Sequence, residues 1–151
     1  MLFFYCSKSE SFIVDKSDTA LKIENGVLKY FDEPFSGKIV SFYLNNQKKV
    51  EINYLNGKKN GIEKKWYKSG KITSERNYFK NLKIGVHEGY WENGSSKFLY
   101  HFNSNGEYMG TVEEWYKNGN RYRSFNYLNG KEAGNQKLWY KKEILKLIMM
   151  L

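Results

Sequence analysis

Short runs rich in aromatic and β-branched residues, separated by turns that contain Gly or Asn, follow one another along most of this chain. The stretch GIEKKWYKSGKITSERNY, residues 61–78, holds two such runs on either side of Ser69-Gly70. Gly and Asn tolerate the positive φ that a two-residue hairpin turn requires, so the stretch is predicted to form a β-hairpin. The sequences YLNGKKNG and YLNGKEAG then supply a second kind of turn, at Asn-Gly, that leads into the next hairpin.

A turn at residues 69–70 determines which residues lie opposite each other in this hairpin. It predicts three pairs: Tyr67 with Ile72, Lys64 with Glu75, and Glu63 with Arg76. The same register further along the chain sets Glu114 opposite Arg123. Opposite charges directly across an antiparallel pair are favourable, so the predicted register is self-consistent.

The hairpin pattern recurs with a period of about 24 residues. It is marked by Gly37, Gly61, Gly85, Gly110 and Gly134, with spacings of 24, 24, 25 and 24. Five residues after each glycine, at the +5 position, stand Phe42, Trp66, Tyr90, Trp115 and Trp139. At the +6 position stand Tyr43, Tyr67, Trp91, Tyr116 and Tyr140. The repeat predicts hairpins at 37–60, 61–84, 85–109 and 110–133, with a partial unit at each end.

These hairpins predict an all-β fold, an elongated antiparallel meander of stacked repeats. Side chains alternate between the two faces of a strand, so the +5 and +6 aromatic residues are expected on opposite faces. Tyr67 is expected to share a face with Ile72 and Tyr78, and Trp66 to share the other with Ile62. Neither face is apolar enough for a thick core, which indicates a single-layer sheet or a shallow roll. A sheet closed on itself would need a clearer alternation between inside and outside.

The repeats resemble the bacterial MORN-repeat variant family, some of whose members are catalogued as YwqK-type antitoxins. The motifs that carry the resemblance are WYKSGKITSERNY, YWENGSSKFLYHF, EEWYKNGNRYRSFNYLNGK and FYLNNQKKVEINYLNGKKNG, within about residues 24–142. The resemblance implies stacked β-hairpins with a binding or scaffolding role.

Composition narrows the class of protein further. The chain has 151 residues, 18% of them aromatic, a single cysteine and a net charge of +9. One cysteine excludes a disulfide framework, and the aromatic content excludes ordinary disorder. A basic body attracts nucleic acid, anionic lipid or an acidic protein. However, only Arg76, Arg121 and Arg123 among the 25 basic residues are arginines. Because Arg makes the bidentate contacts that read bases and Lys keeps surfaces soluble, solvated strand faces explain the charge better.

The two ends of the chain lack the repeat. MLFFYCSKSES places an apolar run before Cys6 and a polar tether after it, which is typical of the end of a bacterial lipoprotein signal. Two interpretations stay open: an envelope-tethered lipoprotein whose true start lies upstream, or a cytoplasmic protein with an inert thiol. Residues 1–23 are therefore predicted as a lead-in and residues 24–151 as the array, with its last unit incomplete.

The segment EILKLIMML, residues 143–151, is apolar apart from Glu143 and Lys146. A strand of this kind at an open sheet edge invites pairing with a second chain, which predicts self-association through residues 143–151. The alternative is a strand that folds back over the last unit.

Candidate chemistry is sparse in this sequence. The two histidines, His87 and His101, occur in one unit, with His87 predicted opposite Tyr100. A metal site with Glu88 is conceivable, but ordinary polar strand positions explain the histidines better. Glu113 and Glu114 are adjacent and point to opposite faces, so they do not form a catalytic carboxylate pair. No catalytic residue, metal site or cofactor is predicted.

The aromatic residues are the remaining candidates for function. They either hold a thin sheet together or form a repeated strip that stacks on bases, sugars or a peptide. The residues chosen for a strip are those of the +5 position: Trp66, Trp115, Trp139, Tyr90 and Phe42. The preferred hypothesis is a non-catalytic module that binds a protein or an envelope polymer. The alternative is a basic, antitoxin-like module that binds a toxin, nucleic acid or an anionic membrane surface.

Overall fold

The computed structural model describes residues 12–140, and within this range the chain forms strands and turns without any helix. The strands are β1 (Ile13–Asp15), β2 (Leu21–Glu24), β3 (Val27–Tyr30), β4 (Glu33–Pro34), β5 (Gly37–Phe42), β6 (Lys48–Leu55), β7 (Lys58–Trp66), β8 (Ile72–Phe79), β9 (Leu82–Lys83), β10 (Gly85–Tyr90), β11 (Ser96–Phe102), β12 (Gly110–Trp115), β13 (Arg121–Leu128) and β14 (Lys131–Leu138). None of the described residues forms a helix that could cross a membrane.

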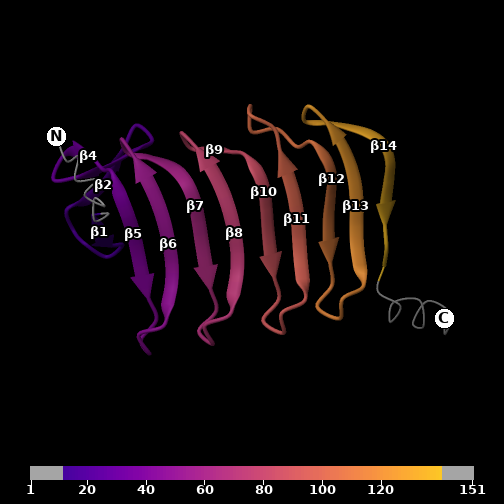
Figure 1. Ribbon diagram of the computed structural model, residues 1–151, viewed down its shortest axis with the longest axis horizontal. Helices are drawn as coiled ribbons and strands as arrows, with labels where there is room; N and C mark the ends of the chain where they lie inside the picture. The colour runs from indigo at the N-terminus through magenta and orange to yellow at the C-terminus, as the bar shows by residue number, and fades with distance from the viewer. Residues whose placement is uncertain (1–11, 141–151) are drawn as a thin grey trace, which may run out of the picture.

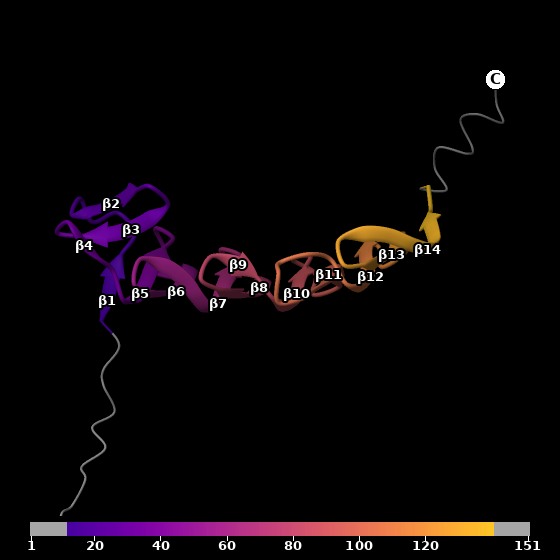
Figure 2. The ribbon, with the colours of Figure 1, turned by 90° about the horizontal axis from the view of Figure 1, so that it is seen from above.

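Most strands form one open sheet in the order β1-β5-β6-β7-β8-β10-β11-β12-β13-β14, with β9 paired to β8. Strands β5 to β14 follow one another along the chain as an antiparallel meander, while β1 adds to β5 in parallel. The sheet is one layer thick and elongated, as the two perpendicular views show (Figures 1 and 2). The predicted all-β array of hairpins is thus confirmed, in the form of a single open layer.

Two kinds of turn connect the strands of the main sheet. The turns that follow β6, β8 and β13 have consecutive residues with positive φ, for example Asn56 at 48° and Gly57 at 71°, as a two-residue turn requires. The turn between the third and fourth units differs, because among residues 103–107 Gly106 alone has a positive φ (80°) and its amide donates to the carbonyl of Asn103. The turns within units are longer: the amide of Gly70 donates to the carbonyl of Tyr67, and only Gly70 (φ 84°), not Ser69, is left-handed. This is a type I turn followed by a left-handed residue, and not the predicted two-residue turn.

The longer turn corrects part of the predicted register. Lys64 pairs with Glu75 and Glu63 with Arg76, as predicted, and Glu114 pairs with Arg123. Beyond Lys65 the register shifts at a bulge, so that Trp66, and not Tyr67, lies opposite Ile72. The prediction that Tyr67 and Ile72 share a face of the sheet is therefore wrong. The shift recurs at the same place in all four hairpins and leaves one residue of each second strand unpaired: Lys49, Thr73, Lys97 and Tyr122.

The hydrophobic core lies at the amino-terminal end of the sheet. Strands β2, β3 and β4 form a separate small sheet that packs over the first hairpin (Figure 2). Leu28 of β3 and Phe35, which directly follows β4, form a buried cluster with Val14 and Ile39. The small sheet and the turn at Gly57 lie so close together that a Cβ atom on Gly57 would be 2.6 Å from the carbonyl oxygen of Leu28. We call the side of the main sheet that carries Ile39 the capped face, because the small sheet covers part of it.

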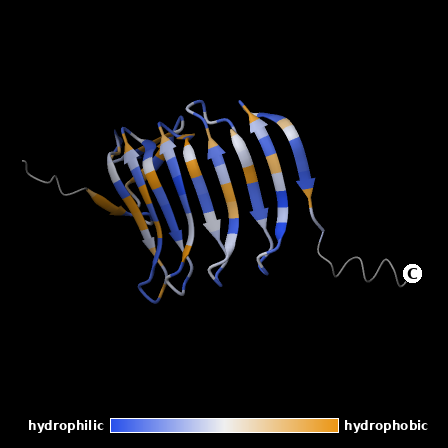
Figure 3. Cartoon of the chain, turned by 45° about the vertical axis from the view of Figure 1, so that its right-hand side comes forward, coloured by the Kyte–Doolittle hydropathy of each residue, from blue (hydrophilic) through white to orange (hydrophobic). Residues whose placement is uncertain are grey.

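Beyond the first hairpin the capped face has no such cover, and hydrophobic and hydrophilic residues are interspersed along the strands (Figure 3). The position two residues after the repeat glycine is nevertheless buried in each of the four hairpins that begin at Gly37, Gly61, Gly85 and Gly110. It holds Ile39 (3% exposed), Glu63 (1%), His87 (2%) and Val112 (0%). His87 thus lies on a strand, as expected, and its side chain is buried there. Neighbouring strands and long side chains cover this position even when the residue itself is polar.

Residues 12–140 test some of the predictions made for the two ends of the chain. Within the predicted lead-in, residues 1–23, β1 and part of β2 form strands. The partial unit expected ahead of Gly37 takes the form of the small sheet. The self-association predicted for residues 143–151 and the lipoprotein interpretation of Cys6 fall outside residues 12–140.

Candidate functional site

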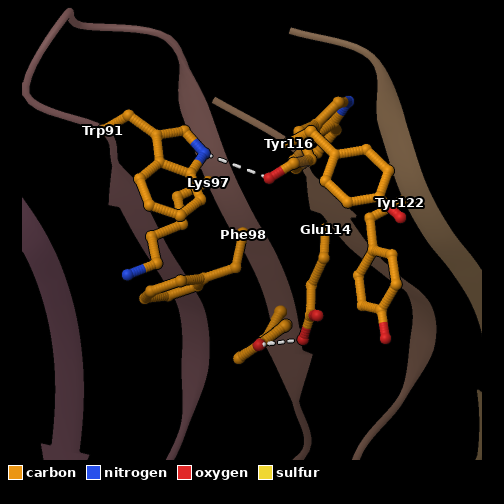
Figure 4. A pocket seen from close by; sticks show the side chains of 8 residues that line it. Trp91, Lys97, Phe98, Glu114, Tyr116 and Tyr122 are labelled. Atoms are coloured by element: carbon orange, nitrogen blue, oxygen red, sulfur yellow. Dashed lines mark hydrogen bonds between the residues drawn. The ribbon is translucent and has the colours of Figure 1, made fainter. Parts of the chain in front are cut away.

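A pocket of about 270 Å³ opens on the capped face between the third and fourth repeats. It is lined by six aromatic residues, one Lys and one Glu: Trp91, Phe98, Tyr100, Trp115, Tyr116, Tyr122, Lys97 and Glu114. Trp91, Lys97 and Phe98 come from the third unit and stand on one side, while Glu114, Tyr116 and Tyr122 come from the fourth (Figure 4). The pocket is thus built by two consecutive hairpins and belongs to neither alone.

The two units are joined at this point by a hydrogen bond that recurs along the sheet. The indole Nε1 of Trp91 donates to the carbonyl oxygen of Trp115 at 3.0 Å. The +6 aromatic residue of each of the four complete units makes this bond to the +5 residue of the next unit. The other donors are Tyr43 to Trp66 (2.9 Å), Tyr67 to Tyr90 (2.9 Å) and Tyr116 to Trp139 (3.0 Å). The +6 side chains therefore hold neighbouring units together, and two of them, Trp91 and Tyr116, line the pocket.

A glycine makes room for the ring of Phe98. Gly89 pairs with Phe98 across the hairpin, and a Cβ atom on Gly89 would lie 2.1 Å from a carbon of that ring. Other units carry Ser41, Lys65 and Glu114 at the position of Gly89. Phe98 lies against the strand and stacks on Tyr100, with 4.6 Å between the ring centroids. The flat aromatic wall is therefore specific to the third unit.

The floor of the pocket carries a partly satisfied carboxylate. Oε1 of Glu114 accepts a hydrogen bond from the hydroxyl of Tyr100 and lies 2.8 Å from the guanidinium of Arg123. Burial and the bond to Glu114 raise the pKa of Tyr100, so its hydroxyl stays protonated and donates. Among the described residues no partner engages the second oxygen, Oε2, which leaves a hydrogen-bond acceptor at the pocket.

Two cations contact the aromatic wall formed by Trp91 and Phe98. The ammonium of Lys97 lies 4.5 Å from the ring centroid of Trp91, a cation–π contact. The guanidinium of Arg76 lies 5.3 Å from the ring of Phe98 and, within residues 12–140, forms no ion pair. Of these cations Lys97 lines the pocket, whereas Arg123 is the one that pairs with Glu114.

The opposite wall is the more exposed one. Tyr116 and Tyr122 pack with 5.2 Å between their ring centroids and an angle of 59° between their planes. Tyr122 is 37% exposed and occupies the bulge position that holds Lys97 in the preceding unit. Its hydroxyl makes no hydrogen bond to any residue of the described range. It is therefore available to a ligand.

The five residues chosen from the sequence lie apart from one another. Phe42 is 49% exposed and Trp139 is 36% exposed. Trp66 and Trp139 each lie beneath a cation of the preceding unit, Lys48 at 5.4 Å and Arg121 at 5.8 Å. Only Trp115 of the five lines the pocket, and Tyr90 accepts the hydrogen bond of Tyr67 through its carbonyl.

The choice of the +5 position missed the other five aromatic residues of the pocket: Trp91, Phe98, Tyr100, Tyr116 and Tyr122. The +6 aromatic pattern already contained Trp91 and Tyr116. A comparison of the repeats would also have shown that aromatic residues replace Val50 and Ile52 at Phe98 and Tyr100. That substitution is the sequence signal for the pocket.

The histidines do not assemble the metal site considered with Glu88. His87 pairs with Tyr100 and Val86 pairs with His101, which places the two imidazoles on opposite faces of the sheet. Within residues 12–140 no group of three or more His, Cys, Asp or Glu residues suits a metal ion.

No protein-family model matches this chain, and no curated protein matches it. Among solved structures, a mutant of the S. aureus glycosyltransferase TarM, crystallised with fondaparinux, alpha-GlcNAc-glycerol and UDP, is similar at 15% sequence identity. The match has a TM-score of 0.37 and covers 78% of this chain but only 22% of the TarM chain. A likeness this weak carries no argument about activity or ligands.

Proposed function

We propose that this chain is a non-catalytic repeat protein that binds a partner, a protein or an envelope polymer, through the aromatic pocket between its third and fourth repeats. The observation that carries this proposal is the pocket itself, in which six aromatic residues surround one partly satisfied carboxylate. Aromatic residues are enriched where proteins recognise partners, because they offer large rigid contact areas. The resemblance of the repeats to bacterial MORN-variant proteins supports the same proposal.

The test is capture of a partner from lysate of the source organism by the full-length chain and two variants. Tyr122→Ala removes an exposed pocket wall, whereas Lys49→Ala removes a cation from the equivalent bulge position of the first unit. We expect the wild type and Lys49→Ala to retain the same component and Tyr122→Ala to lose it. Equal retention by all three proteins would place binding elsewhere and contradict the proposal.

The second candidate function is a basic, antitoxin-like module that binds a toxin, nucleic acid or an anionic membrane surface. The net charge of +9 and the cations around the pocket favour it. Binding to phosphates by several lysines weakens by orders of magnitude between roughly 50 and 200 mM salt, because counterions are released. Fluorescence polarisation of a labelled oligonucleotide across that range separates the two candidates. A salt-insensitive partner supports the first, and steeply salt-dependent oligonucleotide binding the second.

A further inference from the structure

The size of the pocket limits what enters it. Pockets for drug-sized molecules measure roughly 300–1,000 Å³. At about 270 Å³ this pocket takes one six-membered ring with its substituents, and it does not take a folded element such as a helix. A longer ligand would leave one ring inside and continue over the exposed capped face.

The rings of the pocket do not form a row of parallel platforms. Tyr116 and Tyr122 meet at 59°, and Phe98 and Trp91 close the other side (Figure 4). Proteins that bind single-stranded nucleic acid stack successive bases on aromatic platforms along a charged groove. Here the rings surround a single space, which favours a compact ring over a run of stacked bases.

Polar groups at the pocket require a ligand that both donates and accepts hydrogen bonds. Oε2 of Glu114 only accepts, the ammonium of Lys97 only donates, and the hydroxyl of Tyr122 does both. Sugar hydroxyls satisfy all three, because each has one donor and two acceptor sites. The C–H faces of a pyranose meanwhile present an apolar surface to the aromatic rings.

The local charge excludes the other ligand that aromatic walls attract. Quaternary ammonium and methylated lysine bind in aromatic cages through cation–π attraction. Lys97 is the one cation in the pocket lining, and Glu114, the one anion there, is already paired with Arg123. A cationic ligand would be repelled, whereas a neutral polyol is not.

We propose that the pocket holds one pyranose ring of a neutral oligosaccharide. The sugar ring packs between Trp91 and Phe98 on one side and Tyr116 and Tyr122 on the other. Its hydroxyls bond to Oε2 of Glu114 and to Lys97. This inference rests on the proposed function and names the ligand class of the same site.

The test uses the full-length chain and purified tetrasaccharides of defined linkage: chitotetraose, cellotetraose and maltotetraose. Binding is measured by isothermal titration calorimetry and by tryptophan fluorescence, since Trp91 and Trp115 line the pocket. We expect at least one tetrasaccharide to bind, and Tyr122→Ala and Lys97→Ala each to raise its Kd roughly tenfold or more. Lys49→Ala is the matched control, because Lys49 takes the bulge position of Lys97 and lies 5.4 Å from the ring of Tyr43.

Three outcomes overturn the inference. The first is that no tetrasaccharide binds, although the pocket variants abolish capture of a partner from lysate. The proposed function would then stand, and the ligand class would be wrong. The second is sugar binding that neither pocket variant weakens. The third is that a thymidine octanucleotide or decaproline binds in place of the sugars with the same dependence on Tyr122 and Lys97. Circular dichroism spectra of the variants are compared with that of the wild type, so that a loss of folding is distinguished from a loss of binding.

Discussion

His87 occupies one of the most buried positions of the array. Its Nε2 lies 2.7 Å from the carbonyl oxygen of Asn77, and its ring packs between Tyr78 and Phe102 at centroid distances of 5.4 and 4.6 Å. Since that neighbour is an acceptor, Nε2 carries the proton of the neutral ring. Burial lowers the pKa of His87, the carbonyl of Asn77 opposes this, and the charges of Arg76 and Lys83 lower it further.

This lowered pKa predicts a dependence of stability on pH. The unfolded chain, with a histidine pKa of about 6.5, binds a proton more readily than the folded chain. The contribution of the neutral His87 to stability is therefore fully present above about pH 6.5, and it is lost progressively as the pH falls below that value. In His87→Phe, which keeps a ring between Tyr78 and Phe102, this decline disappears. Thermal unfolding followed by circular dichroism from about pH 7.5 to 5 measures it, above the range in which most carboxylates titrate.

A Tm difference between wild type and His87→Phe that stays constant over this pH range would contradict the assignment. Glu63, a carboxylate whose charge raises the pKa of His87, is present in both proteins.

At the scale of the element, the repeated hydrogen bond from each +6 residue is what joins one hairpin to the next. Pairing between units is otherwise brief in places, with two residue pairs between β8 and β10 and two between β11 and β12. The side-chain bonds near the hairpin ends lie beyond those pairs. They therefore limit splaying of neighbouring hairpins.

Tyr67→Phe tests this bond because it removes only the hydroxyl that donates to Tyr90. We expect a loss of about 1 kcal/mol in the free energy of unfolding, the usual net value of one hydrogen bond. Tyr122→Phe is the matched control, since the hydroxyl of Tyr122 has no partner among residues 12–140, and its effect is expected within about 0.5 kcal/mol. Urea unfolding at equilibrium measures both. Equal effects of the two substitutions would show that the recurring bond adds no stability.

At the scale of the whole molecule, packing is unequal along the sheet. The first hairpin lies under the small sheet and holds the buried cluster of Val14, Leu28, Phe35 and Ile39. β14 pairs with β13, and seven of its eight residues are exposed. In a linear array each unit is stabilised by its neighbours, so a difference of this kind makes the two ends open with different free energies.

Hydrogen exchange should reveal that difference. We expect amides of β5 to β7 to exchange most slowly and those of β14 most quickly, with the strands between them intermediate. Mass spectrometry of peptides after timed labelling measures the order. Uniform protection along the sheet would instead show that the array unfolds as one cooperative unit.

Much of this architecture follows from local chemistry and is therefore visible in the sequence. The glycine spacing, the Asn-Gly turns and the pairing of Glu63 with Arg76 depend on residues within one unit or at a unit junction. Period-two alternation and turn preferences act over such short distances. The repeat, the hairpins and the single-layer sheet were predictable for that reason.

Tertiary structure decided what depends on contacts between units. The bulge that moves Ile72 opposite Trp66 follows from a turn type that Ser69-Gly70 alone does not specify. Burial of His87 depends on rings from two other strands, and the pocket depends on Phe98 lying over Gly89 beside Glu114 of the next unit. A repeat pattern states which residue types recur, but the space between two side chains is set by the three-dimensional distance between their strands. The pattern thus located the aromatic residues, and only the folded sheet determined which of them surround a pocket.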